Sequence, residues 1–174
     1  DFDSAIDATN HLIKTGCRTI ALLSSIDNLS VGKLRAKGFY KAIENKGVLV
    51  DENLIILAKN AEDFDAKLVG FFDNNKVDAV FALDEHASVM AMKMAIKKGI
   101  KIPEELSIIG FADGILASRR LAPRLTTVSQ HGIEIGEVAA RLLIDRLESK
   151  EEHVPYETKV IKTKLKERES TRKL

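Results

Sequence analysis

Several protein classes are excluded by what this sequence has little of. It contains one cysteine, Cys17, so no disulfide can form within the chain, which is compatible with a reducing compartment. No run of about 18 apolar residues is present, so the sequence predicts no membrane-spanning helix. The 27 basic and 26 acidic residues almost cancel, whereas a chain that grips nucleic acid by itself normally carries a basic stripe.

The beginning of the sequence also lacks familiar signals. Asp1, Phe2 and Asp3 include no initiator methionine, and they do not start the basic and then apolar pattern of a signal peptide. We therefore expect a soluble piece of something longer, whose preceding part could have held such a signal. With 174 residues, 45% of them hydrophobic, the chain can bury the core of one ordinary domain.

Short apolar runs alternate with amphipathic segments along the first two thirds of the chain. Such an alternation predicts an open parallel sheet with helices on both faces, an α/β fold. Ligands in such sheets bind outside the carboxyl ends of the strands, so function should be sought there. The expected strands are 19–25, 53–59, 77–83 and 106–112, and the expected helices lie around 5–13, 30–47, 64–72 and 84–98.

The stretch LDEHA at 83–87 is similar to the D-E-x-H box of nucleic-acid-dependent ATPases. That box works together with a phosphate loop of the form G-x-x-x-x-G-K-[ST], which this sequence does not contain. A simpler interpretation is that Asp84 caps the helix that follows, because its side chain can accept hydrogen bonds from backbone N–H groups.

Other catalytic patterns are missing as well. There is no G-x-S-x-G nucleophile elbow and no G-x-G-x-x-G dinucleotide loop. The four histidines, of which His86 is most simply a first-turn helix residue, are too scattered to indicate a metal site. We expect no catalytic residue, no metal and no cofactor, and therefore no enzyme.

Two charged residues at the expected strand edge have both a functional and a plain interpretation. Arg35 lies in the first turns of a helix that starts at this edge, and its planar set of donors suits a hydroxyl-rich or anionic small molecule. It could equally be a surface arginine that pairs with a neighbouring acid. Asp113, followed by Gly114, could contact the same ligand or could simply be a turn residue.

Taken together, the motifs resemble those of LacI/GalR-type transcriptional regulators. The pieces that carry this resemblance span essentially the whole chain, in family order: RAKGF (35–39), VDAVFALDEHA (77–87), GIKIPEELSIIGF (99–111), PRLTTVSQ (123–130), IGEVAARLLIDRL (135–147) and KEREST (166–171). The combination of IPEELSIIGF with P-R-LTTV-Q is the most specific of them.

The resemblance implies the C-terminal part of an effector-sensing core with a type I periplasmic-binding-protein-like fold, in which one lobe is Rossmann-like. Residues 1–122 would form the C-terminal lobe, and 123–131 a crossing between lobes. Residues 132–150 would be a helix that normally packs on the N-terminal lobe. Residues 151–174 would return as an edge strand, expected over 159–168, and end in a loose polar tail.

The resemblance also implies the binding residues. Arg35, Asp84, Asp113 and Gln130 would bind a small, sugar-like effector in the cleft between the lobes. The sequence departs from the family at two positions. Leu83 replaces a residue that is commonly Asn, and Ala112 replaces the ligand-binding Asp.

The implied protein is a cytoplasmic homodimer that binds operator DNA through a separate helix-turn-helix head and does not contact a membrane. Ser88, Ala91, Met92 and Ala95 would form the dimer interface, unless these small residues simply face the sheet. The alternative function is an exported solute-binding protein of the same fold for sugar uptake.

The last helix raises a separate expectation. Its apolar residues include Ile133, Ile135, Val138 and Leu142, and they make a face too wide to leave in water. We expect a second copy of the chain to cover this face, or the helix to be displaced from its family position.

Overall fold

The lobe is built on one twisted sheet. The structure is a computed structural model that describes residues 1–47, 50–112, 122–150 and 155–173. The strand order is β2-β1-β3-β4-β5-β6, and every pair is parallel except β5 with β6. The strands are β1 (Ile20–Ser24), β2 (Ile55–Leu57), β3 (Ala79–Ala82), β4 (Ser107–Phe111), β5 (Thr126–Ser129) and β6 (Lys164–Lys166).

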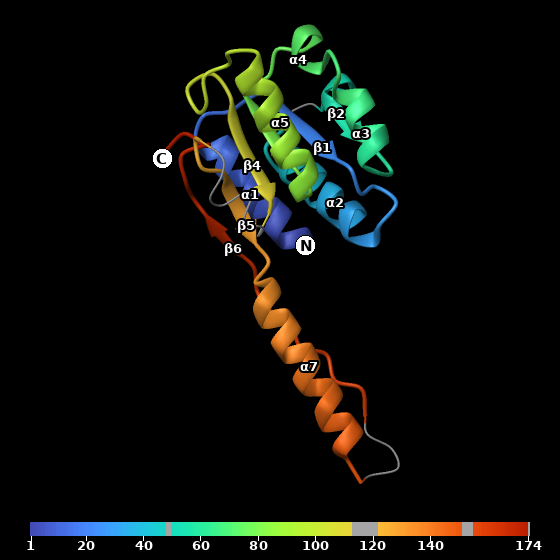
Figure 1. Cartoon of the computed structure of the whole chain (residues 1–174). Helices are drawn as coiled ribbons and strands as arrows, with labels where there is room; N and C mark the ends of the chain where they lie inside the picture. The colour runs from blue at the N-terminus through green and yellow to red at the C-terminus, as the bar shows by residue number, and fades with distance from the viewer. Residues whose placement is uncertain (48–49, 113–121, 151–154, 174) are drawn as a thin grey trace.

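Helices cover both faces of this sheet (Figure 1). One face packs against α1 and α2, and the opposite face packs against α3 and α5. The expected α/β class, a parallel sheet between two helical layers, is therefore confirmed. The helices are α1 (Phe2–Lys14), α2 (Ser30–Asn45), the short 3-10 helix η1 (Glu52–Leu54), α3 (Ala61–Leu68), α4 (Phe71–Asn74), α5 (Glu85–Lys97) and α7 (Gly132–Glu148).

The apolar strands alternate their side chains between the two helical layers. Leu22 and Phe81 lie in the core cluster with α1 and α2, whereas Leu23 and Val80 lie in the cluster with α3 and α5. All four side chains are fully buried. Because both faces are covered, the strands read as continuous apolar runs rather than as an alternation of apolar and polar residues.

Two expected elements differ in detail. The helix expected over 64–72 is divided into α3 and α4, because Gly70 adopts a left-handed φ of 75° that ends one helix and starts the next. The edge strand expected over 159–168 is confined to Lys164–Lys166, which pair with residues 127–129 of β5.

The expectation of a loose polar tail is wrong. Ser170 and Thr171 are buried. The Ser170 hydroxyl donates to the carbonyl oxygen of Ile108 at 2.5 Å and accepts from the backbone N–H of Thr126 at 2.8 Å. Thr171 contacts Nε2 of His11 at 3.2 Å. These hydrogen bonds fix the tail beside β4, β5 and α1.

One part of the chain leaves the lobe. After β5, α7 projects away from the sheet, and residues 155–163 run back alongside it (Figure 1). We call α7 together with 155–163 the arm. All 17 residues of α7 are described and none is buried. Although α7 is rich in apolar residues, no helix in the described part of the chain is long and apolar enough to cross a membrane.

Candidate functional site

The carboxyl ends of β1, β3, β4 and β5 lie at the same edge of the sheet. Helices α2 and α5 begin just after β1 and β3, and α7 begins just after β5. This is the edge at which open α/β sheets place their ligands. The predicted binding residues with described positions, Arg35, Asp84 and Gln130, all come from segments that start or end there.

Arg35 is the centre of this edge. Only 4% of the residue is exposed, although it is charged. Nε donates to the Asp1 carboxylate at 2.8 Å, Nη1 donates to the Leu83 carbonyl oxygen at 2.6 Å, and Nη2 donates to Oε1 of Gln130 at 2.6 Å. Its guanidinium carbon lies 3.8 Å from the centre of the Phe111 ring. Arg35 therefore joins α1, α2, the residue after β3 and the crossing into α7.

The close packing of α1 on α2 explains how Asp1 reaches Arg35. A Cβ atom at Gly38 would lie 2.4 Å from the carbonyl oxygen of Phe2 and 2.7 Å from Cβ of Ala5, so only glycine permits this approach. The contact brings the first residue of the chain over α2. The sequence motif RAKGF thus contributes both the arginine and the glycine that lets an acid reach it.

The Arg35 guanidinium stays charged at neutral pH despite its burial. Loss of hydration lowers its pKa to about 10, and the nearby negative charge of Asp84 opposes that shift. A guanidinium has five N–H donors, and three of them have the partners given above. The other two have no partner in the described part of the chain, so they can serve a hydrogen-bond acceptor of a ligand.

Asp84 is largely committed to holding the local backbone. Oδ1 accepts from the N–H of Ala87 at 2.9 Å and from the Ser25 hydroxyl at 2.8 Å, and Oδ2 accepts from the N–H of Ser25 at 2.8 Å. The prediction that Asp84 caps the following helix is therefore confirmed. The same carboxylate also fixes the loop after β1, which lies at the carboxyl edge of the sheet.

The other acid predicted for the site, Asp113, lies outside the described residues. Ala112, the position at which the resemblance implied a ligand-binding Asp in the family, is 3% exposed and packs in the core beside α5. Of the residues predicted to bind the ligand, Arg35 and Gln130 are therefore the described ones whose side chains are not committed to holding the local backbone as Asp84 is.

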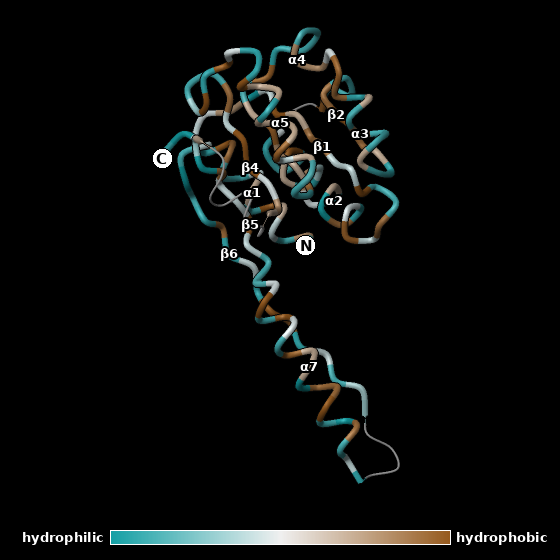
Figure 2. Tube along the Cα trace, in the orientation of Figure 1, coloured by the Kyte–Doolittle hydropathy of each residue, from teal (hydrophilic) through white to brown (hydrophobic). Residues whose placement is uncertain are grey.

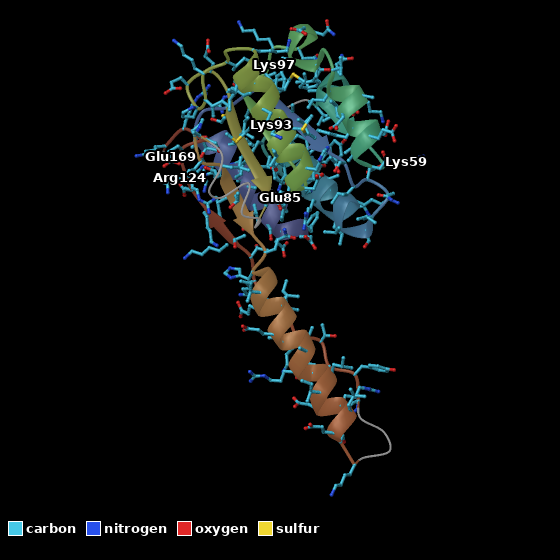
Figure 3. All side chains as sticks on the ribbon, in the orientation of Figure 1. Lys59, Glu85, Lys93, Lys97, Arg124 and Glu169 are labelled. Atoms are coloured by element: carbon cyan, nitrogen blue, oxygen red, sulfur yellow. The ribbon has the colours of Figure 1, made fainter. Side chains whose placement is uncertain are left out.

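The structure contradicts the dimer interface predicted on α5. Ser88, Ala91, Met92 and Ala95 have no exposed surface, because they lie on the side of α5 that faces the sheet. Ser88 packs so closely that a Cβ atom at Gly110 would come within 2.0 Å of its hydroxyl oxygen. The outward side of α5 carries residues such as Lys93 and Lys97 (Figure 3). The plain interpretation, small residues facing the sheet, is the right one.

Two contact residues were missed by sequence reasoning. Asp1 is distant from Arg35 in the chain, and no periodic pattern links the two positions. Phe111 was interpreted as ordinary strand core, although its place in the alternation of β4 puts it on the α2 face of the sheet. That alternation was the available signal, because Arg35 reaches the same edge from α2.

The comparisons with known proteins agree with this architecture. The family model described as a periplasmic binding protein-like domain matches residues 9–171. The chain belongs to the periplasmic binding protein-like domain family. Among its curated relatives is the HTH-type transcriptional regulator DegA of Bacillus subtilis, 37% identical over 137 residues, which are 78% of this chain and 40% of DegA.

Two solved structures show the same likeness for the periplasmic binding protein-like lobe. A putative LacI-family transcriptional regulator from Sanguibacter keddieii has a TM-score of 0.85 and 25% identity, covering 97% of this chain and 64% of that one. The complex of the transcriptional regulator CelR with cellobiose has a TM-score of 0.83 and 30% identity. The match covers 98% of this chain and 53% of the CelR chain. The resemblance to a LacI/GalR-type effector-binding core is thereby confirmed.

The extent of these matches has two consequences. The chain spans about half the length, or less, of the curated relatives that it matches, from 40% to 49% in three of them. In both structural matches no more than 3% of this chain is left uncovered, which is far less than the 17 residues of α7. Most of α7 therefore falls within the aligned part of both structures, and the position of the helix relative to the family stays a prediction.

Proposed function

We propose that this chain is the effector-sensing and dimerisation region of a LacI/GalR-type transcriptional regulator. A small, sugar-like molecule binds at the strand-end edge and modulates DNA binding by a helix-turn-helix head that lies outside this chain. The single observation that carries the proposal is the Arg35–Gln130 pair. These two side chains meet where β3, β5 and the start of α7 converge.

The charge of the edge favours a neutral, hydroxyl-rich effector over an anion. Arg35 is accompanied by two carboxylates: Asp1 is bonded to its Nε, and the negative charge of Asp84 acts on its pKa. An anionic ligand would bring a further negative charge to an arginine that is already balanced. A sugar hydroxyl oxygen can accept a hydrogen bond without bringing a charge, and the two remaining N–H groups of Arg35 can donate it. The cellobiose bound by the structural relative CelR supports the same class of effector.

The remaining parts of the proposal follow the relatives. DegA is an HTH-type regulator, so we assign operator DNA as the partner of the whole protein, the cytoplasm as its location, and no catalytic step to this lobe. A homodimer is proposed as well, although its surface has to lie elsewhere than on the buried side of α5. The exported solute-binding alternative is not favoured, because DegA, PurR and the Sanguibacter keddieii structure, to which this chain is similar, are transcriptional regulators.

The experiment starts with the full-length regulator that contains this chain and a panel of neutral pentoses, hexoses and disaccharides, and it includes their phosphorylated forms as anionic ligands. A ligand that binds only the native state raises the melting temperature, so a thermal-shift screen finds candidates. We expect neutral sugars, and not their phosphates, to give the shift. A panel in which no neutral sugar shifts the melting temperature counts against the proposal.

Calorimetric titration of the best sugar then tests the site. Arg35→Gln keeps a polar side chain but loses the charge, and should weaken binding by about tenfold to a hundredfold, as expected for a lost charge-assisted hydrogen bond. Lys37→Gln is the matched control, because Lys37 is exposed on the same helix. A dissociation constant that is unchanged in Arg35→Gln would remove Arg35 from the site.

A further inference from the structure

The edge of the sheet opposite the candidate site carries a hollow of its own. It lies beside the amino ends of β4 and β5, where the tail that follows β6 is fastened. Its volume of about 900 Å³ is within the range of small-molecule sites. Figure 2 shows that the chain becomes hydrophilic between β6 and the C-terminus. We call this feature the basic hollow. The charged side chains that line it are Arg124, Glu167, Arg168, Glu169, Arg172 and Lys173.

The lining of the basic hollow is positive overall. Four of its charged residues are basic and two are acidic, an excess of two positive charges, although the whole chain is nearly neutral at net +1. One pair cancels within the hollow. Nε of Arg124 donates to both carboxylate oxygens of Glu169 at 2.9 Å, and its Nη2 donates to Oε1 at 2.5 Å. The excess therefore comes from the other three cations.

Arg168 is held in place without losing its charge. Nη1 donates to the carbonyl oxygen of Leu125 at 2.6 Å and to the hydroxyl oxygen of Thr127 at 2.8 Å. Both acceptors are neutral, so they do not compensate the positive charge of this half-buried side chain. Nε and Nη2 have no partner in the described part of the chain. These two atoms form the same donor edge that Arg124 uses to bind Glu169.

Arg172, four residues further along the tail, is fixed in a similar way. Nη2 donates to the carbonyl oxygen of Glu104 at 3.1 Å, and Nη1 lies 3.9 Å from Sγ of Cys17. Burial raises the pKa of the Cys17 thiol, so this contact is also neutral at pH 7. Nε of Arg172 has no partner among the described residues. Two charged guanidinium groups are thus positioned before a ligand arrives, which lowers the entropic cost of binding one.

We propose that the basic hollow binds the phosphate group of a phosphorylated small molecule. A phosphate monoester carries nearly two negative charges at neutral pH, which matches the excess of two positive charges in the lining. Its oxygens suit the unoccupied Nε–Nη2 edge of Arg168, because guanidinium groups bind phosphate through paired N–H donors. Nε of Arg172 and the exposed ammonium group of Lys173 supply further donors.

The surroundings of Arg35 and Arg168 separate the ligands of the two sites. Arg35 donates to the carboxylate of Asp1 and is therefore already balanced, which favours a neutral effector. Arg168 donates only to a carbonyl and a hydroxyl oxygen, so its charge still attracts an anion. The two arginines also lie at opposite edges of the sheet. The phosphate site therefore goes beyond the proposed effector site and does not depend on it.

The first test is a calorimetric titration of the full-length regulator that contains this chain, at low ionic strength, with inorganic phosphate and pyrophosphate as probes. Both should bind, and Arg168→Gln should weaken their binding by about tenfold because one charge-assisted contact is lost. Lys93→Gln is the matched control: it removes an exposed cation from α5, outside the hollow (Figure 3), and should leave the dissociation constants unchanged. Circular dichroism should show both variants folded.

This control also locates the site, because a DNA-binding head can itself attract anions. If Arg168→Gln and Lys93→Gln weaken binding equally, the probes respond only to the overall charge and the proposal is overturned. A wild type that binds neither probe overturns it as well. Arg168→Gln should leave the binding of a neutral sugar unchanged, so failure at the basic hollow and failure of the effector proposal are distinguishable.

The second test increases the charge of the hollow. Glu169→Gln removes the carboxylate that occupies the donor edge of Arg124, so pyrophosphate should bind about threefold more tightly. A variant that merely disturbed the tail would weaken binding instead. Unchanged or weaker binding of pyrophosphate by Glu169→Gln would overturn the proposal.

Discussion

The lobe and the arm use the same apolar residue types with opposite results. Leu22 and Leu23 of β1 are fully buried between two helical layers. Leu143 and Leu147 of α7 are 57% and 75% exposed, although α7 is as regular as any helix of the lobe. The comparison teaches that an apolar pattern predicts a surface to be covered but does not say which molecule covers it. In the lobe, other segments of this chain do so.

The same truncation in the lobe and in the arm should have very different effects on stability. Leu22→Ala should lower the free energy of unfolding by about 3–5 kcal/mol, because it removes buried methyl groups and leaves a cavity. Leu143→Ala should change it by no more than about 0.5 kcal/mol, because the side chain already faces water and alanine favours helix. Urea unfolding followed by circular dichroism measures both. Equal losses would mean that the arm contributes to the folding unit of the lobe.

The sequence allowed the lobe to be predicted well because each of its elements carries a local signal. The parallel strands are apolar runs, and Asp84 precedes a helix as a cap residue should. The break at Gly70 was missed, because Phe64, Leu68 and Phe72 keep helical spacing across the left-handed turn. A single glycine there decides the boundary, and periodicity does not detect it.

The candidate site was predictable only in part. Arg35 and Gln130 were identified through the family motifs, and the structure joins them by a hydrogen bond. The contact between Arg35 and Asp1 was not predictable from spacing, because it depends on the close packing of α1 on α2 at Gly38. The prediction of a dimer interface on α5 was wrong because residue size alone does not say what a helix packs against. Small residues suit a helix–sheet contact as well as a helix–helix contact.

The second prediction concerns how the tail is fastened to the lobe. Ser170→Ala removes the hydroxyl that donates to the carbonyl oxygen of Ile108 and leaves the N–H of Thr126 buried without its partner. An unsatisfied buried donor costs about 1–3 kcal/mol, so the free energy of unfolding should fall by that amount. Thr158→Ala, an exposed hydroxyl residue on the returning part of the arm, is the control and should have little effect. Similar losses in the two variants would contradict the assigned anchoring.

The smallest predicted effect is a pH dependence that belongs to the lobe. His11, on α1, is buried beside Thr171 of the tail, and loss of hydration lowers its pKa below the usual 6.5, although Glu167 opposes the shift. Between the lowered pKa and 6.5 the unfolded chain binds more protons at this position than the folded chain does. The free energy of unfolding should therefore be highest above pH 6.5 and should fall as the pH drops through that range.

The variant His11→Gln tests the source of this pH dependence. Glutamine can still hydrogen-bond to Thr171 but does not titrate, so the contribution of this position to the slope of stability against pH should disappear. Urea unfolding of wild type and variant at pH 7.5 and pH 5.5 gives the two slopes. If the variant keeps the full slope of the wild type, the pH dependence comes from other groups, and His11 does not make the contact between α1 and the tail sensitive to acid.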